Sequence, residues 1–410
     1  MSESGYNANV LIGVAIIGLL IGAGLGFGGS QIATSDEGGV SGKLKVGFIY
    51  VGPTGDIGWT AAHDKARMIL DEKYDWLETN FVADVTEGQE GPFIDNLIND
   101  WGADVIFTTS FGFMDGTIAK GLEYPDTIFF HISGFKRAKN VGTVFADFYQ
   151  LYFLNGLMAG ALTQTDQIGY VAAFELPELI RHINAFQLGA RFINPDVTTH
   201  VTWINSWFDP TSARNAATSL VGAEDVDVLA FTEDTAAVVE YAEETANVYA
   251  FSHYSPMQVL GPTSTISGQL VKWEVLYESI IQKIFLGEYT NENLENVDIL
   301  GLLKEDAVQL GGSFDEVINS EFKTRLEAVT VDDPLLGTIN VWDLVLARID
   351  EMSDTNVRFE PFTGPIYDQD GVLRLADGER MSIGDLLSIL WFIGVEGGCT
   401  TANDVGCVVS

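Results

Sequence analysis

The chain has 410 residues, of which 47% are hydrophobic, so it is long enough for two lobes that each bury a core. Its formal charge of −37, from 58 acidic and 21 basic residues, excludes partners bound through clustered lysine and arginine, such as nucleic acids and anionic membrane surfaces. The same surplus fits a protein in high salt or one that faces an acidic exterior, and composition leaves both settings open.

The amino-terminal region contains an uncharged apolar run from Val10 to Phe27, which spans ~27 Å as a helix. No lysine or arginine precedes this run, and no small-x-small cleavage site follows it. These features favour an uncleaved transmembrane helix over a cleaved signal peptide. We therefore predict a membrane anchor over 1–33 and a polar, glycine-rich tether over 34–42, with the rest of the chain on the extracytoplasmic side of the cell membrane.

From Lys43 onward, strand and helix signals alternate in two successive runs. Because such alternation is typical of βαβ units, it predicts an α/β fold with two doubly wound, Rossmann-like lobes. Two lobes joined by short crossings enclose a cleft, and a hinged cleft that closes is typical of a binding protein. The strands are expected at 45–51, 81–85, 104–109, 127–132 and 142–146, and then at 168–173, 199–204, 226–231 and 247–252.

The domain boundaries follow from this pattern. The first lobe is expected over 43–147, with a return segment at about 256–290 that contains a long helix over 268–286. The second lobe is expected over 148–255, with a carboxyl-terminal segment over 291–396. Residues 397–410 form a tail with both cysteines, Cys399 and Cys407, and a bridge between them would contribute roughly 2.5 kcal/mol in an oxidising compartment. Two thiols without a nearby histidine make half of a metal site, so we predict no metal or cofactor.

The loop after the first strand carries the first candidate site. Gly52, Gly55 and Gly58 allow a sharp turn, and Asp56 and Trp59 stand three residues apart. A carboxylate beside a flat apolar face suits a planar ligand that bears N–H groups, and ligands bind at the carboxyl ends of parallel strands. The alternative, that Trp59 belongs to the core and Asp56 caps a helix, remains open.

Other strand ends also carry aromatic and acidic residues. If Trp59 from one lobe faces Trp207 from the other, the gap between them is a slot for a flat ring, and Asp234 or Asp56 can accept hydrogen bonds from that ring. Core packing of Phe111 and Phe174 is an equally open alternative. The predicted ligand-binding residues are Asp56, Gly58, Trp59, Ser110, Phe111, Phe174, Trp207 and Asp234.

Five stretches carry a resemblance to a known family: VGFIYVGPTGDIGWTAAHD, TTSFGFMD, IGYVAAFELPELIRHINAFQLGARFINPD, NSWFDP and EPFTGPIYDQDGVLRLADGE. Together they resemble the basic membrane protein (PnrA-like) family of ABC-transporter substrate-binding proteins. The resemblance implies a type I periplasmic-binding-protein fold, an ABC permease as partner and a purine nucleoside or related base as ligand. It places the ring-stacking aromatics on Trp59 and Trp207 and the first-loop acid on Asp56. Pro256 stands where relatives carry an aspartate suited to sugar hydroxyls, which puts ribose binding in doubt.

No set of catalytic residues accompanies these motifs. The five histidines are scattered, and neither a GxSxG elbow nor a phosphate-binding loop is present in the sequence. A pairing of Glu175 with Asp234 as acid and base is the weakest of the readings. The sequence therefore predicts an extracytoplasmic solute-binding protein rather than an enzyme. The alternative is a membrane-tethered receptor, sensor or surface structural protein with the same fold.

Overall fold

The computed structural model describes residues 42–394 and 408–409. The predicted anchor, Val10 to Phe27, and the predicted Cys399–Cys407 bridge lie outside the described residues. Within the described part of the chain, no helix is both long and apolar enough to cross a membrane. From Lys43 onward, the described residues form one compact unit, which contains all the elements given below.

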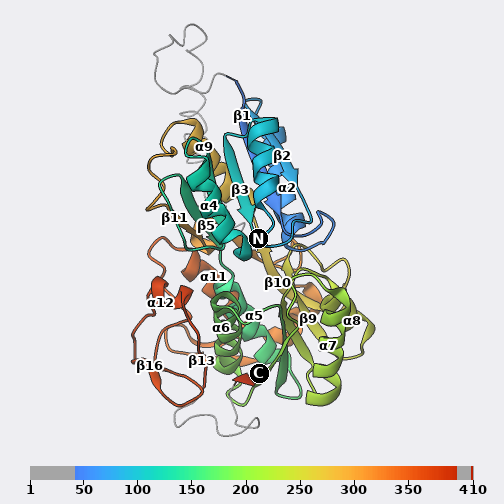
Figure 1. Cartoon of the computed structure of the whole chain (residues 1–410). Coiled ribbons are helices and arrows are strands. Elements are labelled where there is room, and N and C mark those ends of the chain that lie inside the picture. The colour runs from blue at the N-terminus through green and yellow to red at the C-terminus, as the bar shows by residue number, and fades with distance from the viewer. Residues whose placement is uncertain (1–41, 395–407, 410) are drawn as a thin grey trace, which may run out of the picture. The chain divides into compact units, whose positions relative to one another are not determined.

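The first lobe is built on a parallel six-stranded sheet with the order β11-β5-β4-β3-β1-β2 (Figure 1). Every residue of β3 is buried and all but one of β1, as expected for strands that are covered by helices on both faces. The strands are β1 (Leu44–Tyr50), β2 (Leu77–Val82), β3 (Val105–Thr109), β4 (Ile128–Ile132), β5 (Val141–Ala146) and β11 (Asp298–Gly301), and the helices are α2 (Trp59–Lys73), α3 (Gly91–Asn96), α4 (Met114–Glu123) and α9 (Trp273–Phe285).

The second lobe is built on a seven-stranded sheet with the order β12-β10-β9-β8-β6-β7-β17. Among its described strands, β12 pairs antiparallel with β10, and the other pairs are parallel. The last described residues, β17 (Val408–Val409), pair in parallel with β7. The other strands are β6 (Gln167–Ala172), β7 (Thr198–Trp203), β8 (Val228–Thr232), β9 (Tyr249–Tyr254), β10 (Thr265–Val271) and β12 (Val308–Leu310), and the helices are α5 (Tyr149–Leu162), α6 (Pro177–Ile193), α7 (Pro210–Glu224) and α8 (Ala237–Glu244).

Two helices of the second lobe, α5 and α6, approach each other closely enough that only glycine fits at the contact. A Cβ atom on Gly156 would lie 2.1 Å from the carbonyl oxygen of Phe186, and one on Gly189 would lie 2.0 Å from that of Phe153. Nearly every residue of α5 is buried. The pair therefore forms the rigid centre of the second lobe.

The chain crosses between the lobes three times. The crossings follow β5 at Asp147, follow β10 at Lys272 and follow β11 over 302–307. Backbone hydrogen bonds join them, since Asp147 N donates to Gly301 O at 3.0 Å and Lys272 N donates to Ala307 O at 2.8 Å. Short, mutually bonded crossings of this kind are typical of a hinge.

The crossings differ from the expected return segment at about 256–290. Residues 265–271 are a strand of the second sheet, so the helix expected over 268–286 begins only at Trp273. Likewise, β11 lies in the first sheet although it was expected in the second lobe. The physical reason is that TISGQLV contains three β-branched residues, Thr265, Ile266 and Val271, and that all seven residues are buried, which favours a strand over a helix.

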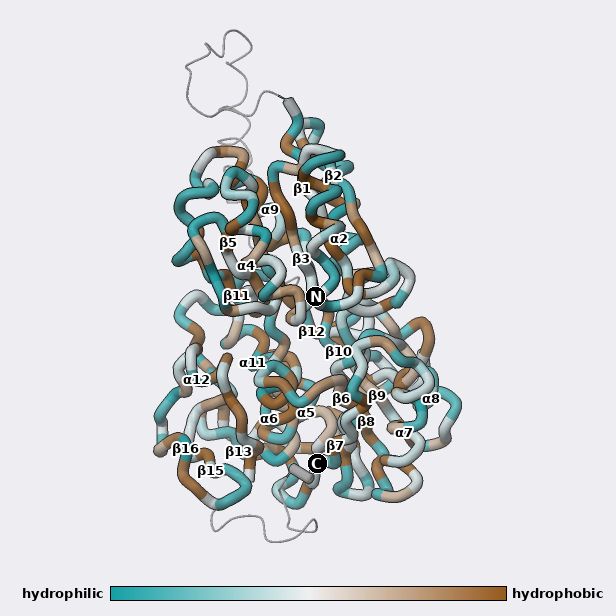
Figure 2. The backbone as a smooth tube through the Cα atoms, viewed as in Figure 1, coloured by the Kyte–Doolittle hydropathy of each residue, from teal (hydrophilic) through white to brown (hydrophobic). Residues whose placement is uncertain are grey.

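The carboxyl-terminal segment lies along α5 and α6 (Figure 1). Its buried Arg348 pairs with Asp333 and Glu351, which leaves no unpaired charge at that position. Figure 2 shows hydrophobic residues gathered along β1 in the first sheet and near β8 and β9 in the second. The elements of this segment are α10 (Lys323–Glu327), β13 (Thr330–Asp333), β14 (Gly337–Asn340), α11 (Val341–Ser353), β15 (Ile366–Tyr367), β16 (Leu373–Leu375) and α12 (Ile383–Leu387).

Candidate functional site

The loop after β1 is held by the side chain of Asp56. Its carboxylate accepts hydrogen bonds from the backbone N–H groups of Gly58, Thr60 and Ala61, at 2.8, 2.9 and 2.9 Å. Asp56 is 5% exposed, and burial raises the pKa of its carboxyl while the three N–H groups oppose that shift. Asp56 therefore caps the start of α2, which leaves its oxygen atoms engaged with the chain itself.

Trp59, the first residue of α2, belongs both to the core and to a pocket. Its indole N–H donates to Thr109 O at 2.7 Å, and its ring packs edge-on against His63 and Trp273, with centroids 4.5 and 5.4 Å away. Across the cleft it meets Tyr254 of the second lobe at 5.2 Å. The ring is 6% exposed, so its position is set by the protein before any ligand binds.

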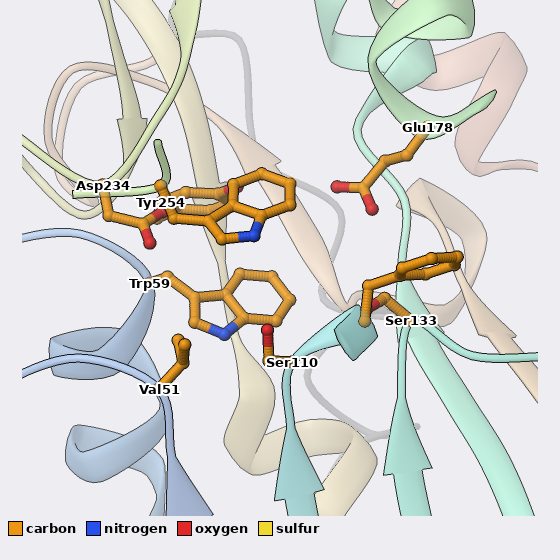
Figure 3. A pocket seen from close by; sticks show the side chains of 9 residues that line it. Val51, Trp59, Ser110, Ser133, Glu178, Asp234 and Tyr254 are labelled. Carbon is orange, nitrogen blue, oxygen red and sulfur yellow. The ribbon is translucent and has the colours of Figure 1, made fainter. Parts of the chain in front are cut away.

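The pocket lies between the carboxyl ends of the strands of the two sheets (Figure 3). About 280 Å³ of space lies among its lining residues, including some that is open to solvent, and little of it is wide enough for a water molecule. The walls therefore lie nearly in contact, and a ring-sized ligand requires them to separate. The lining residues are Val51, Trp59, Ser110, Phe111 and Ser133 from the first lobe, and Glu178, Trp207, Asp234 and Tyr254 from the second.

The structure brings five of the eight predicted residues to this pocket, namely Trp59, Ser110, Phe111, Trp207 and Asp234. The other three support the walls from behind. Asp56 caps α2 as described above. Phe174 packs against Trp207, with ring centroids 5.2 Å apart and an interplanar angle of 63°. Gly58 makes the third supporting contact.

Gly58 lies against the backbone of Asp234, which belongs to the opposite lobe. A Cβ atom on Gly58 would lie 2.6 Å from the carbonyl oxygen of Asp234, too close for any side chain. Ser255 Oγ also donates to Gly58 O at 3.4 Å. The absence of a side chain at position 58 thus allows the two lobes to touch beside the pocket.

Asp234 presents a carboxyl group that the protein does not satisfy. The residue is 3% exposed, and its Oδ1 atom has no hydrogen-bond partner among the described residues. Its backbone N–H donates to Trp207 O at 2.7 Å, which ties the acid to one of the aromatic walls. Burial, followed by the negative charge of Asp56, raises the pKa of the Asp234 carboxyl well above its usual range.

Glu178 is a pocket residue that the sequence analysis missed. It stands in the first turn of α6 rather than at a strand end, so inspection of strand ends could not find it. Burial raises the pKa of its carboxyl to about 7, and Arg181 only partly opposes this shift. Arg181 is committed elsewhere, because its Nε donates to the fully buried carboxylate of Asp147 at 2.6 Å.

The ion pair between Asp147 and Arg181 joins the hinge to the pocket. Asp147 also bonds His182 Nε2 at 3.0 Å, and these partners bring the pKa of its carboxyl to about 2, although burial opposes them. Asp147 sits on the first crossing between the lobes, whereas Arg181 and His182 lie one turn beyond Glu178 on α6. The hinge therefore fixes the helix that carries the pocket acid.

Val51, which directly follows β1, was also missed. So were Ser133, which directly follows β4, and Tyr254, the last residue of β9. Both have positive φ angles, 61° and 60°, as does Ile57 in the first loop at 60°. Such backbone conformations are costly for residues other than glycine, and they cluster at functional sites. Tyr254 also stands two residues before Pro256, which is not one of the residues that line the pocket.

A wider groove continues from the pocket and shares Phe111, Ser133 and Glu178 with it. Its lining is mostly apolar and includes part of α12. Glu175, considered above as an acid partner of Asp234, is exposed and lines neither cavity. Among the described residues, no three His, Cys, Asp or Glu side chains are grouped as a metal site.

Comparisons with known proteins extend these observations. The family model described as "ABC transporter substrate-binding protein PnrA-like" matches residues 43–331. The purine-binding protein of Brucella abortus is 33% identical over 356 residues, which cover 86% of this chain and 93% of its own. A Haloferax volcanii protein, provisionally named ABC transporter glucose-binding protein TsgA13, is 33% identical over 314 residues, which cover 76% and 78%.

A solved ABC transporter solute-binding protein from Conexibacter woesei has the same fold. Its TM-score with this chain is 0.58 at 18% identity, and the match covers 78% of this chain and 99% of the solved one. The two relatives that are 33% identical carry names with different ligands, a purine and glucose. The chemistry of the pocket must therefore decide between ligand classes.

Proposed function

Because this chain belongs to the PnrA-like family of ABC transporter substrate-binding proteins, we propose that it delivers a planar, N–H-bearing heterocycle of the purine class to an ABC permease. Proteins of this family bind solutes rather than transform them, and they do so outside the cytoplasm. The proposal concerns the ligand class, the residues that hold the ligand and the way in which the protein is attached to the membrane.

One observation carries the ligand class. Trp59 and Trp207, from opposite lobes, line the same narrow pocket as the unsatisfied carboxyl of Asp234. Stacking on an aromatic face contributes about 1 to 3 kcal/mol per ring, and a buried carboxyl without a partner favours a ligand that donates hydrogen bonds. A flat heterocycle with N–H groups meets both requirements. The hydroxyl groups of Ser110 and Ser133 donate to Glu87 Oε1 and Ile132 O, at 2.5 and 2.8 Å, so toward a ligand they can act as acceptors.

The binding step is a closure of the two lobes. The pocket lies between lobes that are joined by three short crossings, and its walls nearly touch. A ligand therefore enters with the lobes apart and is enclosed as Gly58 returns to the backbone of Asp234. Enclosure removes water from the ring and from the carboxyl group, which strengthens the hydrogen bonds between them.

Attachment to the membrane is proposed from the sequence alone. The apolar run Val10–Phe27 is long enough to cross a bilayer, and the polar stretch over 34–42 provides a tether to the folded part. A disulfide between Cys399 and Cys407 fits the oxidising conditions outside the cytoplasm. Both features are consistent with an anchored solute-binding protein.

Thermal unfolding of the full-length protein tests the ligand class. The panel contains purine bases, purine nucleosides, glucose and unrelated solutes, at low and at high salt. A purine ligand at a hundred times its Kd adds about 2.7 kcal/mol, which raises the Tm by about 3 °C for a chain of this size. We expect the ligand to lose this effect on the Tm in the Trp207→Ala variant. The control is Trp342→Ala, which removes a half-buried tryptophan outside the pocket and should keep the Tm shift.

Each alternative outcome has a clear meaning. A shift with glucose alone would assign the protein to the sugar-binding relatives and contradict the heterocycle. Equal shifts in the Trp207→Ala variant and in the unmodified protein would contradict the stacking model. A folded protein that responds to no compound would favour a receptor or structural role.

A further inference from the structure

The two lobes contribute unequal charge to the pocket. Of the nine described residues that line it, two are acids, Glu178 and Asp234, and none is a lysine, arginine or histidine. Arg181, a basic residue on the same helix as Glu178, is held by Asp147 at 2.6 Å. The pocket therefore carries acidic groups without a counterion from its own lining.

Asp234 shows that this excess of acidic groups belongs to the pocket itself and is not only a part of the acidic protein surface. Its side chain is 3% exposed, its Oδ1 atom has no partner among the described residues, and Figure 3 shows its carboxyl group directed toward Trp59. Figure 3 also shows Glu178 on the other side of the pocket from Asp234, and both residues line it. A buried acid and a half-buried acid on the walls of one pocket define a position for positive charge.

The remaining lining supplies the second requirement of a cation site. The rings of Trp59, Phe111, Trp207 and Tyr254 all border the pocket. The face of an aromatic ring is negative, so it attracts a cation, and the attraction is strongest where water is excluded. Aromatic faces around buried acids are therefore better suited to a cation than to a neutral molecule of the same shape.

Resting on the function proposed above, we propose that the preferred ligand is a planar organic cation, a heterocycle with a positively charged ring nitrogen. The flat ring lies between the aromatic walls, and its charge lies between Asp234 and Glu178. A neutral heterocycle can donate one N–H to Asp234, but it does not favour the ionised form of the two carboxyl groups as a cation does. Charge thus becomes the property by which the cleft selects among flat rings.

Proton release should accompany binding. Burial favours the protonated form of both carboxyls, and a bound cation favours the ionised form. Asp56, Glu87 and Glu233 raise the pKa of Asp234 further, whereas Arg181 lowers and Asp147 raises that of Glu178. Because the cation binds the ionised groups, its affinity should rise with pH, while that of a neutral ring should not.

Titration calorimetry with a matched pair of probes tests the inference on the full-length protein. 1-Methylnicotinamide is a flat, permanent cation, and 3-methylbenzamide has nearly the same shape without the charge. We expect the cation to bind roughly tenfold more tightly or better, with an advantage larger at pH 8 than at pH 5.5. Repeating the titration in buffers of different ionisation enthalpy measures the protons released.

Three variants locate the effect. Asp234→Asn and Glu178→Gln should each reduce the advantage of the cation. Both replace a carboxyl group by a neutral amide of the same shape, so neither is expected to prevent folding. Glu175→Gln changes an exposed acid outside the pocket and should leave the advantage intact. At 1 M salt, where the Debye length is about 3 Å, attraction to the acidic surface is screened but the buried site is not.

The outcomes separate this inference from the function on which it rests. Equal binding of the two probes, or an advantage that disappears in 1 M salt and survives Asp234→Asn, would overturn the inference. If the cation fails to bind while a neutral purine raises the Tm, the inference is wrong and the proposed function stands. If neither the probes nor the purines bind, both are wrong.

Discussion

The first lobe offers a neutral, pre-formed wall of the pocket, whereas the second lobe offers an acidic one. Val51, Trp59, Ser110, Phe111 and Ser133 bring rings and hydroxyl groups but no charge. The facing wall contains both acids, Glu178 and Asp234, together with Trp207 and Tyr254. The first lobe thus supplies an uncharged wall and the second lobe supplies the acidic groups, so a ligand contacts both only when the cleft is closed.

The two tryptophans show the same contrast. Trp59 is 6% exposed, with its indole N–H bonded to Thr109 and its ring packed on two neighbours in its own lobe. Trp207 is half-buried in the loop between β7 and α7, with Phe174 as its ring partner. Trp59 is therefore a core residue whose ring also borders the pocket. Trp207 is a half-buried loop residue that lines the pocket and packs on Phe174.

The largest expected effect comes from breaking the ion pair between Asp147 on the first crossing and Arg181 on α6. Asp147→Asn leaves the buried guanidinium of Arg181 without its counterion, so we expect the free energy of unfolding to fall by about 3 to 5 kcal/mol. Urea denaturation measures the loss. Lys139→Met removes an exposed ion pair with Glu292 and should leave the free energy of unfolding nearly unchanged. Equal losses in the two variants would show that the buried pair does not hold α6.

Truncating each tryptophan should separate stability from binding. Trp59→Ala removes a buried ring and its hydrogen bond, so we expect a loss of about 3 to 5 kcal/mol in stability as well as weaker binding. Trp207→Ala should cost about 1 kcal/mol in stability, because the ring is only half-buried. Denaturation curves of the two variants, measured without ligand, provide the comparison. A larger loss for Trp207→Ala would reverse the roles assigned to the two walls.

Adding one methyl group at position 58 should keep the walls apart. Gly58→Ala places a Cβ atom 2.6 Å from the carbonyl oxygen of Asp234, and overpacking of this kind costs about 1 to 3 kcal/mol of the closed state. We expect ligand affinity to fall about tenfold, measured by calorimetry. Gly55→Ala is the control, since no atom lies within 4 Å of its added Cβ. Unchanged affinity in both variants would mean that closure does not pass through this contact.

The smallest predicted effect concerns the pH dependence contributed by Glu178. Its pKa in the folded state, about 7, lies above its ordinary value of 4.5, so the folded protein holds an extra proton between these values and loses stability as pH rises through them. Glu178→Gln removes this titration. The variant should gain about 1 to 2 kcal/mol over the unmodified protein at pH 8, because water in the groove screens the group, and almost nothing at pH 4.5. A gain independent of pH would contradict the shift.

Much of this architecture could be predicted, because buried parallel strands and their helices leave a clear alternation in sequence. The five pocket residues found in advance stand at strand ends or, for Trp59, at the start of the first helix. Ser133 directly follows β4 and Tyr254 is the last residue of β9, so inspection of every strand end would have found both. Glu178 could not be found that way, because its place depends on how α6 is held against the hinge by Arg181 and Asp147.

The boundary between strand and helix after residue 264 was harder for a physical reason. Residues 265–285 contain no proline and only one glycine, so no turn signal separates the strand from the helix, and tertiary pairing divides them into β10 of one lobe and α9 of the other. Whether Asp56 and Trp59 belong to the helix cap and the core or to the binding site was open for a similar reason. A capping carboxylate and a binding carboxylate have the same local sequence, and the three N–H groups around Asp56 distinguish them only in the folded chain.

The glycine contacts between α5 and α6 determine how the second lobe can respond to a ligand. Backbone lies against backbone at Gly156 and Gly189, so the helices have no side-chain layer in which to slide. A rotation about the crossings therefore carries α6 and its acid along as a single block with the sheet behind it. Recognition in this protein is then an all-or-none event of whole lobes, and a poorly matched solute is rejected by incomplete closure rather than by adjustment of individual side chains.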